Sequence, residues 1–283
     1  MPAIFGPAGQ CEASRLAGVN STEKFLRYLA EKGIHAFEYQ CGRGVNVGEE
    51  KARTFARLSK ELGISISLHA PYYISLASME EQKRLNSVEY IWKSAAAVDW
   101  MGGDRIVVHP GGLGKFTREE ALELAKDTLR LAQKKLDEIG LGHVHMCLET
   151  MGKINQLGNL EEVISMCELD ERMLPCVDFG HMNSRLKGGM NSREEFEALL
   201  DEMKVRLGEE RTNRMHVHFS KIEYSAGGEV RHLTFEDQVF GPDYVPLMEL
   251  FVQRKMEPVV ICESAGTQTA DALAMQLEYQ SRI

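Results

Sequence analysis

The sequence predicts a single parallel α/β barrel of eight strand–helix units, a (β/α)8 TIM barrel, over residues 1–283. Short apolar runs of strand length alternate with amphipathic runs of helical period along the whole chain, which is the pattern of a parallel α/β fold. The length of 283 residues is typical of such a barrel, and no linker or low-complexity tract divides it. A doubly wound open sheet is the alternative, but no glycine-rich dinucleotide turn follows the first predicted strand.

Eight apolar, β-branched runs are predicted as the strands. They lie at residues 3–9, 34–39, 64–69, 105–109, 143–149, 174–178, 214–219 and 258–263. The predicted helices follow them at residues 20–32, 48–62, 79–101, 117–139, 159–169, 191–207, 244–256 and 270–281. Three of these helices open with capping-box spacing, given by Asn20 with Glu23, Thr117 with Glu120 and Asn191 with Glu194.

The composition bounds the class of protein. With 43% hydrophobic and 27% charged residues, the chain can bury a large core and is not disordered. No apolar run approaches membrane-spanning length, and the start lacks the pattern of a signal peptide. We therefore expect a cytoplasmic monomer with no membrane partner. Six cysteines occur without a C-x-x-C pair, so we expect reduced, buried thiols.

The formal net charge of −9 argues against a broad basic surface for nucleic acid. Three bound divalent cations would offset six of these negative charges and would concentrate positive charge in one place. The charge balance therefore does not exclude an anionic substrate if the protein binds several metal ions.

Six consecutive predicted strands, the third to the eighth, finish in metal-ligand residue types. These are His69, His109, Glu149, Asp178 with His181, His216 with His218, and Glu263. Each alone has an ordinary explanation, such as a hydrogen-bonded histidine or a helix cap. Because functional residues of a barrel collect where the strands end, one metal centre explains all six positions together. Imidazoles and carboxylates without thiolates suit Zn²⁺, Mn²⁺ or Fe²⁺, and bridging carboxylates suit two-metal phosphoryl chemistry.

Two details of the predicted site remain open. His216 and His218 lie two residues apart and share the inward face of their strand, so one can bind a metal while the other hydrogen-bonds to a ligand or substrate. The long segment 221–243 carries Glu229 and His232. We expect it to fold back so that these side chains meet His181 in a further site, because long loops in compact domains are usually functional or mobile.

Together these residues resemble endonuclease IV, the zinc-dependent apurinic/apyrimidinic endonuclease family of xylose-isomerase-like barrels. The resemblance covers nearly the whole chain in order. It is carried by His69-Ala70-Pro71-Tyr72, His109-Pro110-Gly111, Glu149-Thr150 with Gly158, Asp178-x-x-His181, Met215-His216 with Lys221, Arg231-His232 and Glu263.

The resemblance implies which residues would hold each ion. His69, His109 and Glu149 would hold one. A second ion, sharing Glu149, would be held by Asp178, His216 and Glu263, and a third by His181 and His232. Two or three Zn²⁺ ions per chain are implied, with Mn²⁺ or Fe²⁺ as alternatives.

The resemblance also implies a reaction and a partner. The family cleaves the phosphodiester 5′ of an abasic site in DNA, by attack of a metal-bridging hydroxide. Glu149 and Glu263 would be the catalytic residues. Tyr72 matches a residue on a loop that enters the minor groove. The remaining predicted substrate contacts are His218, Lys221 and Arg231.

Three segments depart from the family pattern. Strand seven reads His-Val-His-Phe-Ser-Lys over residues 216–221, where the family has His-x-Asn-Asp/Glu-Ser/Ala-Lys. Val230 stands where the family has an aspartate, which leaves Glu229 as a weaker third ligand. We expect a bend at Gly227-Gly228 to bring Glu229 back to the two histidines. Residues 40–46 differ from the usual DNA-penetrating loop.

The alternative function is that of a metal-dependent sugar isomerase or epimerase on the same type of barrel. Such enzymes place carboxylates and a histidine on strands five to eight around a single ion, and carboxylates move the protons. His69 and His109 discriminate between the two functions, because a second ion needs them and a single-metal enzyme does not.

Overall fold

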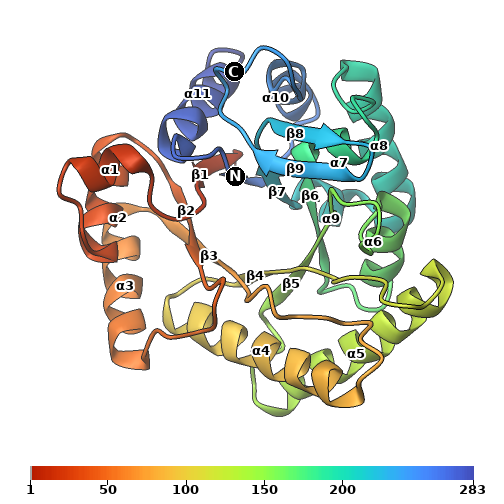
Figure 1. Cartoon of the computed structure of the whole chain (residues 1–283). Coiled ribbons are helices and arrows are strands. Elements are labelled where there is room, and N and C mark those ends of the chain that lie inside the picture. The colour runs from red at the N-terminus through yellow and green to blue at the C-terminus, as the bar shows by residue number, and fades with distance from the viewer. Residues whose placement is uncertain (1) are drawn as a thin grey trace.

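The computed structural model describes residues 2–283. Eight parallel strands form one nearly closed barrel, and helices surround it on the outside (Figure 1). The strands neighbour one another in the order β1-β10-β7-β6-β5-β4-β3-β2. This arrangement confirms the predicted (β/α)8 barrel and brings the carboxyl ends of all eight strands to one mouth.

The barrel strands are β1 (Ile4–Pro7), β2 (Ala36–Gln40), β3 (Ser65–His69), β4 (Arg105–Val108), β5 (His145–Glu149), β6 (Leu174–Asp178), β7 (His216–Phe219) and β10 (Val259–Cys262). The predicted helices appear as α2 (Thr22–Glu31), α3 (Glu49–Leu62), α4 (Glu81–Trp100), α5 (Arg118–Glu138), α6 (Leu160–Cys167), α8 (Arg193–Leu207), α10 (Val245–Gln253) and α11 (Gln268–Gln280). The elements that were not predicted are α1 (Glu12–Leu16), α7 (Phe179–Arg185), α9 (Glu209–Asn213), β8 (Ile222–Ser225) and β9 (Gly228–His232).

The barrel closes where β1 approaches β2. Ala8 and Glu38 form a parallel bridge there, and the amide of Gly9 donates to the carbonyl of Glu38 at 3.0 Å. A Cβ atom on Gly6 would lie 1.8 Å from the carbonyl oxygen of Ala36, closer than any real contact. The close approach of these two strands therefore depends on glycine at position 6.

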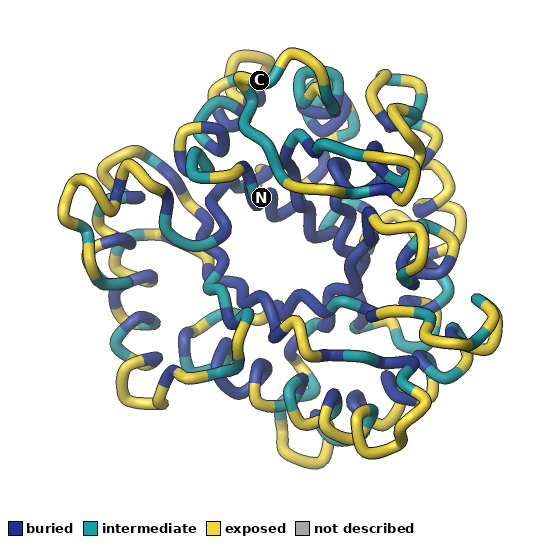
Figure 2. Tube along the Cα trace, viewed as in Figure 1, coloured by how far each residue is buried: buried dark blue, intermediate teal, exposed yellow. Residues whose placement is uncertain are grey.

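The main core lies between the strands and the surrounding helices, where the phenylalanines at 5, 25, 55, 179 and 219 are fully buried. The barrel strands themselves are buried along most of their length (Figure 2). A small apolar cluster of Val107, Cys147, Leu174 and Cys176 lies apart from the main core. All six cysteines are free and buried, as predicted. No helix within residues 2–283 is long and apolar enough to cross a bilayer.

Two helix caps lie one residue further along the chain than predicted. The hydroxyl of Ser21, rather than the side chain of Asn20, caps α2, because Asn20 instead accepts from the Lys24 ammonium. The capping box of α8 is Ser192 with Glu195 rather than Asn191 with Glu194. The amide oxygen of Asn191 instead accepts from the backbone of Asp243. The predicted box of Thr117 with Glu120 is present at the start of α5.

Part of segment 221–243 forms an antiparallel hairpin, β8–β9, that lies beside the mouth of the barrel (Figure 1). Its turn is fastened to the loop after β5. The amide of Ile154 donates to the Gly227 carbonyl at 3.2 Å, and that of Glu229 donates to the Gly152 carbonyl at 3.3 Å. Gly228 has a φ of 93°, and a Cβ atom there would meet the Gly152 oxygen at 2.2 Å. The contact holds β9 and its side chains over the site.

Candidate metal centre

The first ligand set, His69, His109 and Glu149, comes from the ends of β3, β4 and β5. Its ligand atoms lie within 4.8 Å of one another. The Nε2 atoms of His69 and His109 lie 3.4 and 2.8 Å from Oε2 of Glu149. Nδ1 of His69 is 2.8 Å from the Ala70 carbonyl, which leaves Nε2 for the site. Two imidazoles and a carboxylate form a usual set of ligands for zinc.

The second ligand set, Glu149, Asp178, His218 and Glu263, shares Glu149 with the first. Nδ1 of His218 lies 3.3 Å from Oε1 of Glu149 and 3.6 Å from Oε2 of Glu263. Asp178 caps helix α7, since its Oδ1 accepts from the amide of His181 at 2.7 Å. Oδ2 of Asp178 is thereby left for the site.

Buried oxygens within these two sets test whether a cation fits. Oδ2 of Asp178 and Oε2 of Glu149 are buried, and no donor within residues 2–283 meets either of them in hydrogen-bond geometry, although imidazole nitrogens of His181 and His109 lie 3.3 and 2.8 Å away. A buried acceptor without a partner is costly, and its free lone pairs are what a cation would coordinate. The first and second ligand sets therefore fit divalent metal ions.

The third ligand set, His181, Glu229 and His232, joins α7 to the hairpin. Glu229 lies 3.5 Å from Nε2 of His181 and 3.9 Å from Nε2 of His232. The two imidazole rings lie 5.5 Å apart. Nδ1 of His181 lies 2.9 Å from the Thr150 carbonyl, and Nδ1 of His232 lies 2.8 Å from the Ser220 hydroxyl. Both Nε2 atoms are therefore free for a ligand.

The chain does turn at Ala226-Gly227, next to the predicted bend at Gly227-Gly228, and a β-bulge then helps to bring Glu229 to the histidines. Glu229 pairs with Tyr224, and Arg231 pairs with Glu223, so Val230 is an extra residue on β9. An extra residue shifts the alternation of side chains by one. Glu229 and His232, three positions apart, can therefore face the same way, while Val230 is 52% exposed.

The structure places His216 apart from the second ligand set that it was predicted to join. It lies instead in a deeper group with Cys176 and His218, and its Nε2 lies 2.9 Å from Oε2 of Glu38. Strand β7 continues to Phe219, and His218 is the residue that pairs in register with Asp178. His216 is one full pleat deeper in the barrel. His218, predicted as a substrate contact, therefore occupies the position predicted for His216.

Glu38 on β2 is a site residue that the sequence did not predict. It is fully buried in the barrel and lies beside both His216 and His218. The hydroxyl of Ser67 donates to it at 3.1 Å. The sequence signal for it was a single carboxylate within a short apolar strand. Burying a carboxylate charge is unfavourable unless it is paired, so its presence there indicates a partner.

Of the other three predicted substrate contacts, the structure brings Tyr72 to the mouth. Its ring lies 5.7 Å from that of His109 and is 60% exposed. Lys221 instead lies against a separate cavity and donates to the carbonyl of Asp237. Arg231 is exposed and pairs with Glu223 at 2.7 Å. Lys221 and Arg231 thus lie outside the mouth cavity because their side chains engage partners along the hairpin and the loop after it.

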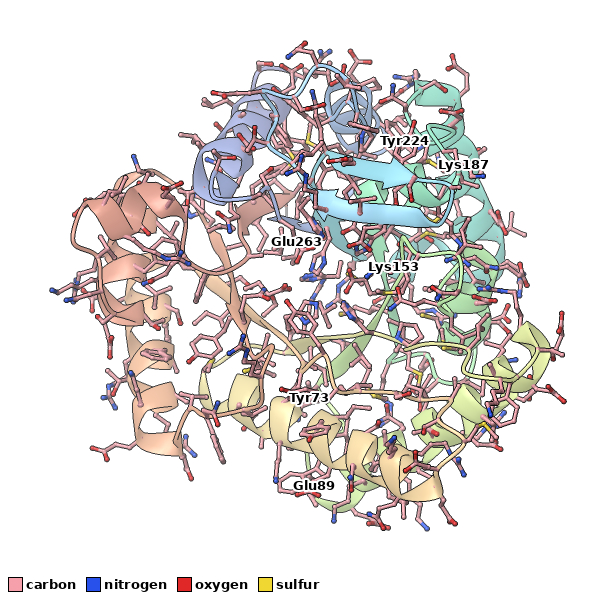
Figure 3. All side chains as sticks on the ribbon, viewed as in Figure 1. Tyr73, Glu89, Lys153, Lys187, Tyr224 and Glu263 are labelled. Carbon is pink, nitrogen blue, oxygen red and sulfur yellow. The ribbon has the colours of Figure 1, made fainter. Side chains whose placement is uncertain are left out.

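The mouth is a cavity of about 840 Å³ above the ligand sets. Glu263 and Lys153 lie near the middle of the barrel in the view of Figure 3. Arg15, Arg43 and Lys153 line the cavity together with amide side chains. Among the described residues, Arg43 and Lys153 form no salt bridge. Their charges can therefore face an anionic substrate.

The carboxylates shift the pKa values of the histidines in the site. Burial opposes protonation of His69 and His181, but Glu149 raises the pKa of His69 to about 9, and Asp178 with Glu149 raises that of His181 to about 10. Burial would raise the pKa of Glu149, yet the imidazoles of His109 and His218 hold it well below its usual range. Burial lowers the pKa of His216 to about 4, so that deeper ring is neutral. Without metal, the site therefore holds protons that a cation must displace.

Comparison with known proteins identifies the type of fold and two kinds of relative. Residues 26–279 match a family model described as a xylose isomerase-like TIM barrel. An uncharacterized protein of Methanocaldococcus jannaschii is 32% identical over 265 residues, covering 92% of this chain and 91% of that protein. A probable endonuclease 4 of Acholeplasma laidlawii is 29% identical over 177 residues, covering 60% of this chain and 58% of that protein.

Solved structures show the same barrel at low sequence identity. A D-tagatose 3-epimerase-like protein has a TM-score of 0.73 at 18% identity, covering 98% of this chain and 97% of that one. Endonuclease IV from Thermus thermophilus has a TM-score of 0.68 at 18% identity, covering 93% of this chain and 97% of that one. At such identities the likeness shows the fold alone.

Proposed function

Since the chain belongs to the xylose isomerase-like TIM barrel family, we propose that it is a zinc-dependent phosphodiesterase that cleaves DNA 5′ of abasic sites. The observation that supports this reaction is the adjacency of three ligand sets, of which the first two share Glu149. A carboxylate shared between neighbouring cation positions is typical of sites that carry out phosphoryl chemistry. A single-ion enzyme has no need of the first and third sets.

The ligand sets define which residues would hold the ions. His69, His109 and Glu149 would hold the first, and His181, Glu229 and His232 the third. Glu149, Asp178, His218 and Glu263 would hold the second. Divalent cations supply Lewis-acid stabilisation of phosphoryl oxygens and promote the ionisation of water. Zn²⁺ suits these ligands best, and Mn²⁺ or Fe²⁺ use the same ligand types.

Residues of the chain itself would bind and orient the substrate. Glu263 is 15% exposed at its side chain, so it reaches from the second ligand set into the cavity and can orient an attacking water. Arg43 and Lys153 would attract phosphates on the two sides of the scissile bond. Tyr72 exposes an aromatic ring at the rim, where an unpaired base or sugar can stack. The cavity is lined by three cationic side chains and three carboxylates, so bound cations would make it locally positive despite the net charge of −9.

The test is metal-dependent nicking of an end-labelled duplex that contains one abasic site. Glu149→Gln and Glu263→Gln should abolish nicking, because each removes a charged oxygen from the ligand sets. Glu223→Gln is the matched control, since Glu223 pairs with Arg231 on the hairpin outside the mouth cavity. A zinc-loaded wild-type protein that leaves the abasic duplex intact would overturn the proposal.

A second candidate function is epimerisation of a sugar. It is favoured by the second ligand set, which by itself offers four side chains to a single ion. His109→Ala discriminates between the two functions because His109 belongs to the first ligand set alone. It should abolish phosphodiester cleavage, whereas a single-ion epimerase would keep its activity. Conversion of a ketose by both the wild type and His109→Ala would favour epimerisation.

A further inference from the structure

A buried carboxylate lies beneath the second ligand set, outside the cavity that a substrate can enter. Glu38 comes from β2 and is fully buried. It does not line the mouth cavity, and it belongs to none of the three ligand sets. It nevertheless contacts His218, which is a member of the second set.

The surroundings of Glu38 consist of hydrogen-bond donors. Its Oε1 lies 3.1 Å from Nε2 of His218 and accepts from the side-chain amide of Gln40 at 3.1 Å. Its Oε2 lies 2.9 Å from Nε2 of His216 and accepts from the hydroxyl of Ser67 at 3.1 Å. An ionised carboxylate can only accept hydrogen bonds. These four donors therefore match an ionised Glu38 that accepts one N–H from the His218 ring and one from the His216 ring.

The two nitrogens of His218 face different partners. Nδ1 faces Glu149 and Glu263 at 3.3 and 3.6 Å, and Nε2 faces Glu38. We propose that Glu38 is a positioning residue that holds the proton of His218 on Nε2 and thereby directs the Nδ1 lone pair into the second ligand set. This inference rests on the proposed metal centre but not on the choice between phosphodiester and sugar chemistry.

Two other histidines of the ligand sets use neutral groups for the same purpose. His69 faces a backbone carbonyl through Nδ1, and His232 faces a hydroxyl. Nδ1 of His181 lies 2.9 Å from the Thr150 carbonyl, but Glu149 and Asp178 each have an oxygen 3.3 Å from it. A carboxylate partner makes an imidazole a stronger ligand than a neutral partner does, and it also fixes the tautomer. His218 therefore gains both orientation and basicity from β2, a strand that contributes no member of the ligand sets.

His216 completes the arrangement from the deeper level of the same strand. Its Nε2 lies against Glu38, while its Nδ1 is buried and forms no hydrogen bond within residues 2–283. The His216 ring engages Oε2 of Glu38, the oxygen that His218 approaches less closely, and so limits rotation of the carboxylate. Replacing Glu38 by glutamine puts an amide NH₂ where one of the two rings donates, and that ring loses its acceptor.

The first experiment is calorimetric titration of metal-free protein with Zn²⁺. Glu38→Gln should weaken binding at the second ligand set by about 10–100-fold, and it should leave the third set unchanged. Ser67→Ala is the matched control because it removes a hydrogen bond to the same carboxylate without touching an imidazole. Equal weakening at the second and third sets would indicate a purely structural role and would overturn the proposal, as would unchanged affinity.

The second experiment needs no variant and stands even if Glu38→Gln does not fold. Nitrogen-15 spectra of the histidines in the zinc-loaded wild type should show a proton on Nε2 of His218. A proton on Nδ1 would overturn the proposal. Both measurements are made without substrate, so failure to cleave abasic DNA would count against the proposed function and not against the role of Glu38.

Discussion

Glu149 occupies the junction between the first two ligand sets and has no solvent exposure. Its Oε2 faces His69 and His109, and its Oε1 lies 3.3 Å from both His181 and His218. One carboxylate thus touches four imidazoles. In the absence of metal, the raised pKa values of His69, His181 and His218 favour protons on these three rings, which offset the charge of Glu149.

This pairing predicts a pH dependence of zinc binding. Because the pKa of His69 is raised to about 9 and that of His181 to about 10, both rings carry protons at neutral pH in the metal-free protein. Zinc requires neutral imidazoles, so its affinity should rise as pH rises from 6 towards 9. Titrations in buffers of different ionisation enthalpy should reveal proton release on binding at pH 7. A pH-independent affinity without proton release would contradict the prediction.

The same shifts determine how the metal-free protein responds to alkali. A histidine whose pKa is raised by folding stabilises the folded state most below its unfolded pKa, about 6.5. That contribution is lost as pH rises through the folded-state values of about 9 and 10. The metal-free and zinc-loaded proteins should therefore differ most in stability at alkaline pH.

At the scale of elements, the barrel strands were predictable but the depth of a side chain within the barrel was not. The two-residue period places His216 and His218 on the same face. It does not say which of them is level with Asp178, because that depends on the register between β6 and β7. Similarly, segment 222–232 is too polar to be recognised as a hairpin, since it packs over the mouth rather than in the core.

The bulge in β9 predicts the effect of shortening the hairpin by one residue. Deletion of Val230 should leave a regular strand in which Glu229 and His232 are two positions apart and still share a face. The deletion variant should therefore keep its full zinc content, measured by metal analysis after dialysis. Glu229→Ala is the contrasting variant, because it removes a ligand of the third set and should lose one zinc ion per chain. Loss of zinc from the deletion variant would show that the third ligand set needs the extra residue itself.

At the scale of the whole molecule, the closure of the barrel fixes where β2 lies relative to the other strands. The polar members of the interior, Glu38 among them, converge because β1 and β2 complete the ring. The alternation of strands and helices along the chain was enough to predict this ring. Its junction at Gly6 could not be predicted, because the steric demand comes from Ala36, which is remote in sequence.

Replacement of Gly6 by alanine should therefore weaken the whole barrel. The new methyl group would collide with the Ala36 carbonyl, and overpacking of this kind costs about 1–3 kcal/mol in the free energy of unfolding. Urea denaturation of the metal-free protein measures the loss. Gly112→Ala is the control, since a Cβ atom there would have no neighbour within 4 Å. Equal stability of both variants would show that β1 and β2 can move apart without cost.

The third ligand set also has a mechanical consequence. His181 belongs to α7, while Glu229 and His232 belong to the β8–β9 hairpin. Helices α8 and α9 and strand β7 lie between them in the chain. A cation shared by these residues would act as a reversible crosslink that closes the intervening segment into a loop. Like a disulfide, such a link restricts the unfolded chain and so stabilises the native one. Availability of metal would then govern how often the hairpin detaches from the mouth, and with it how often the cavity opens to a large substrate.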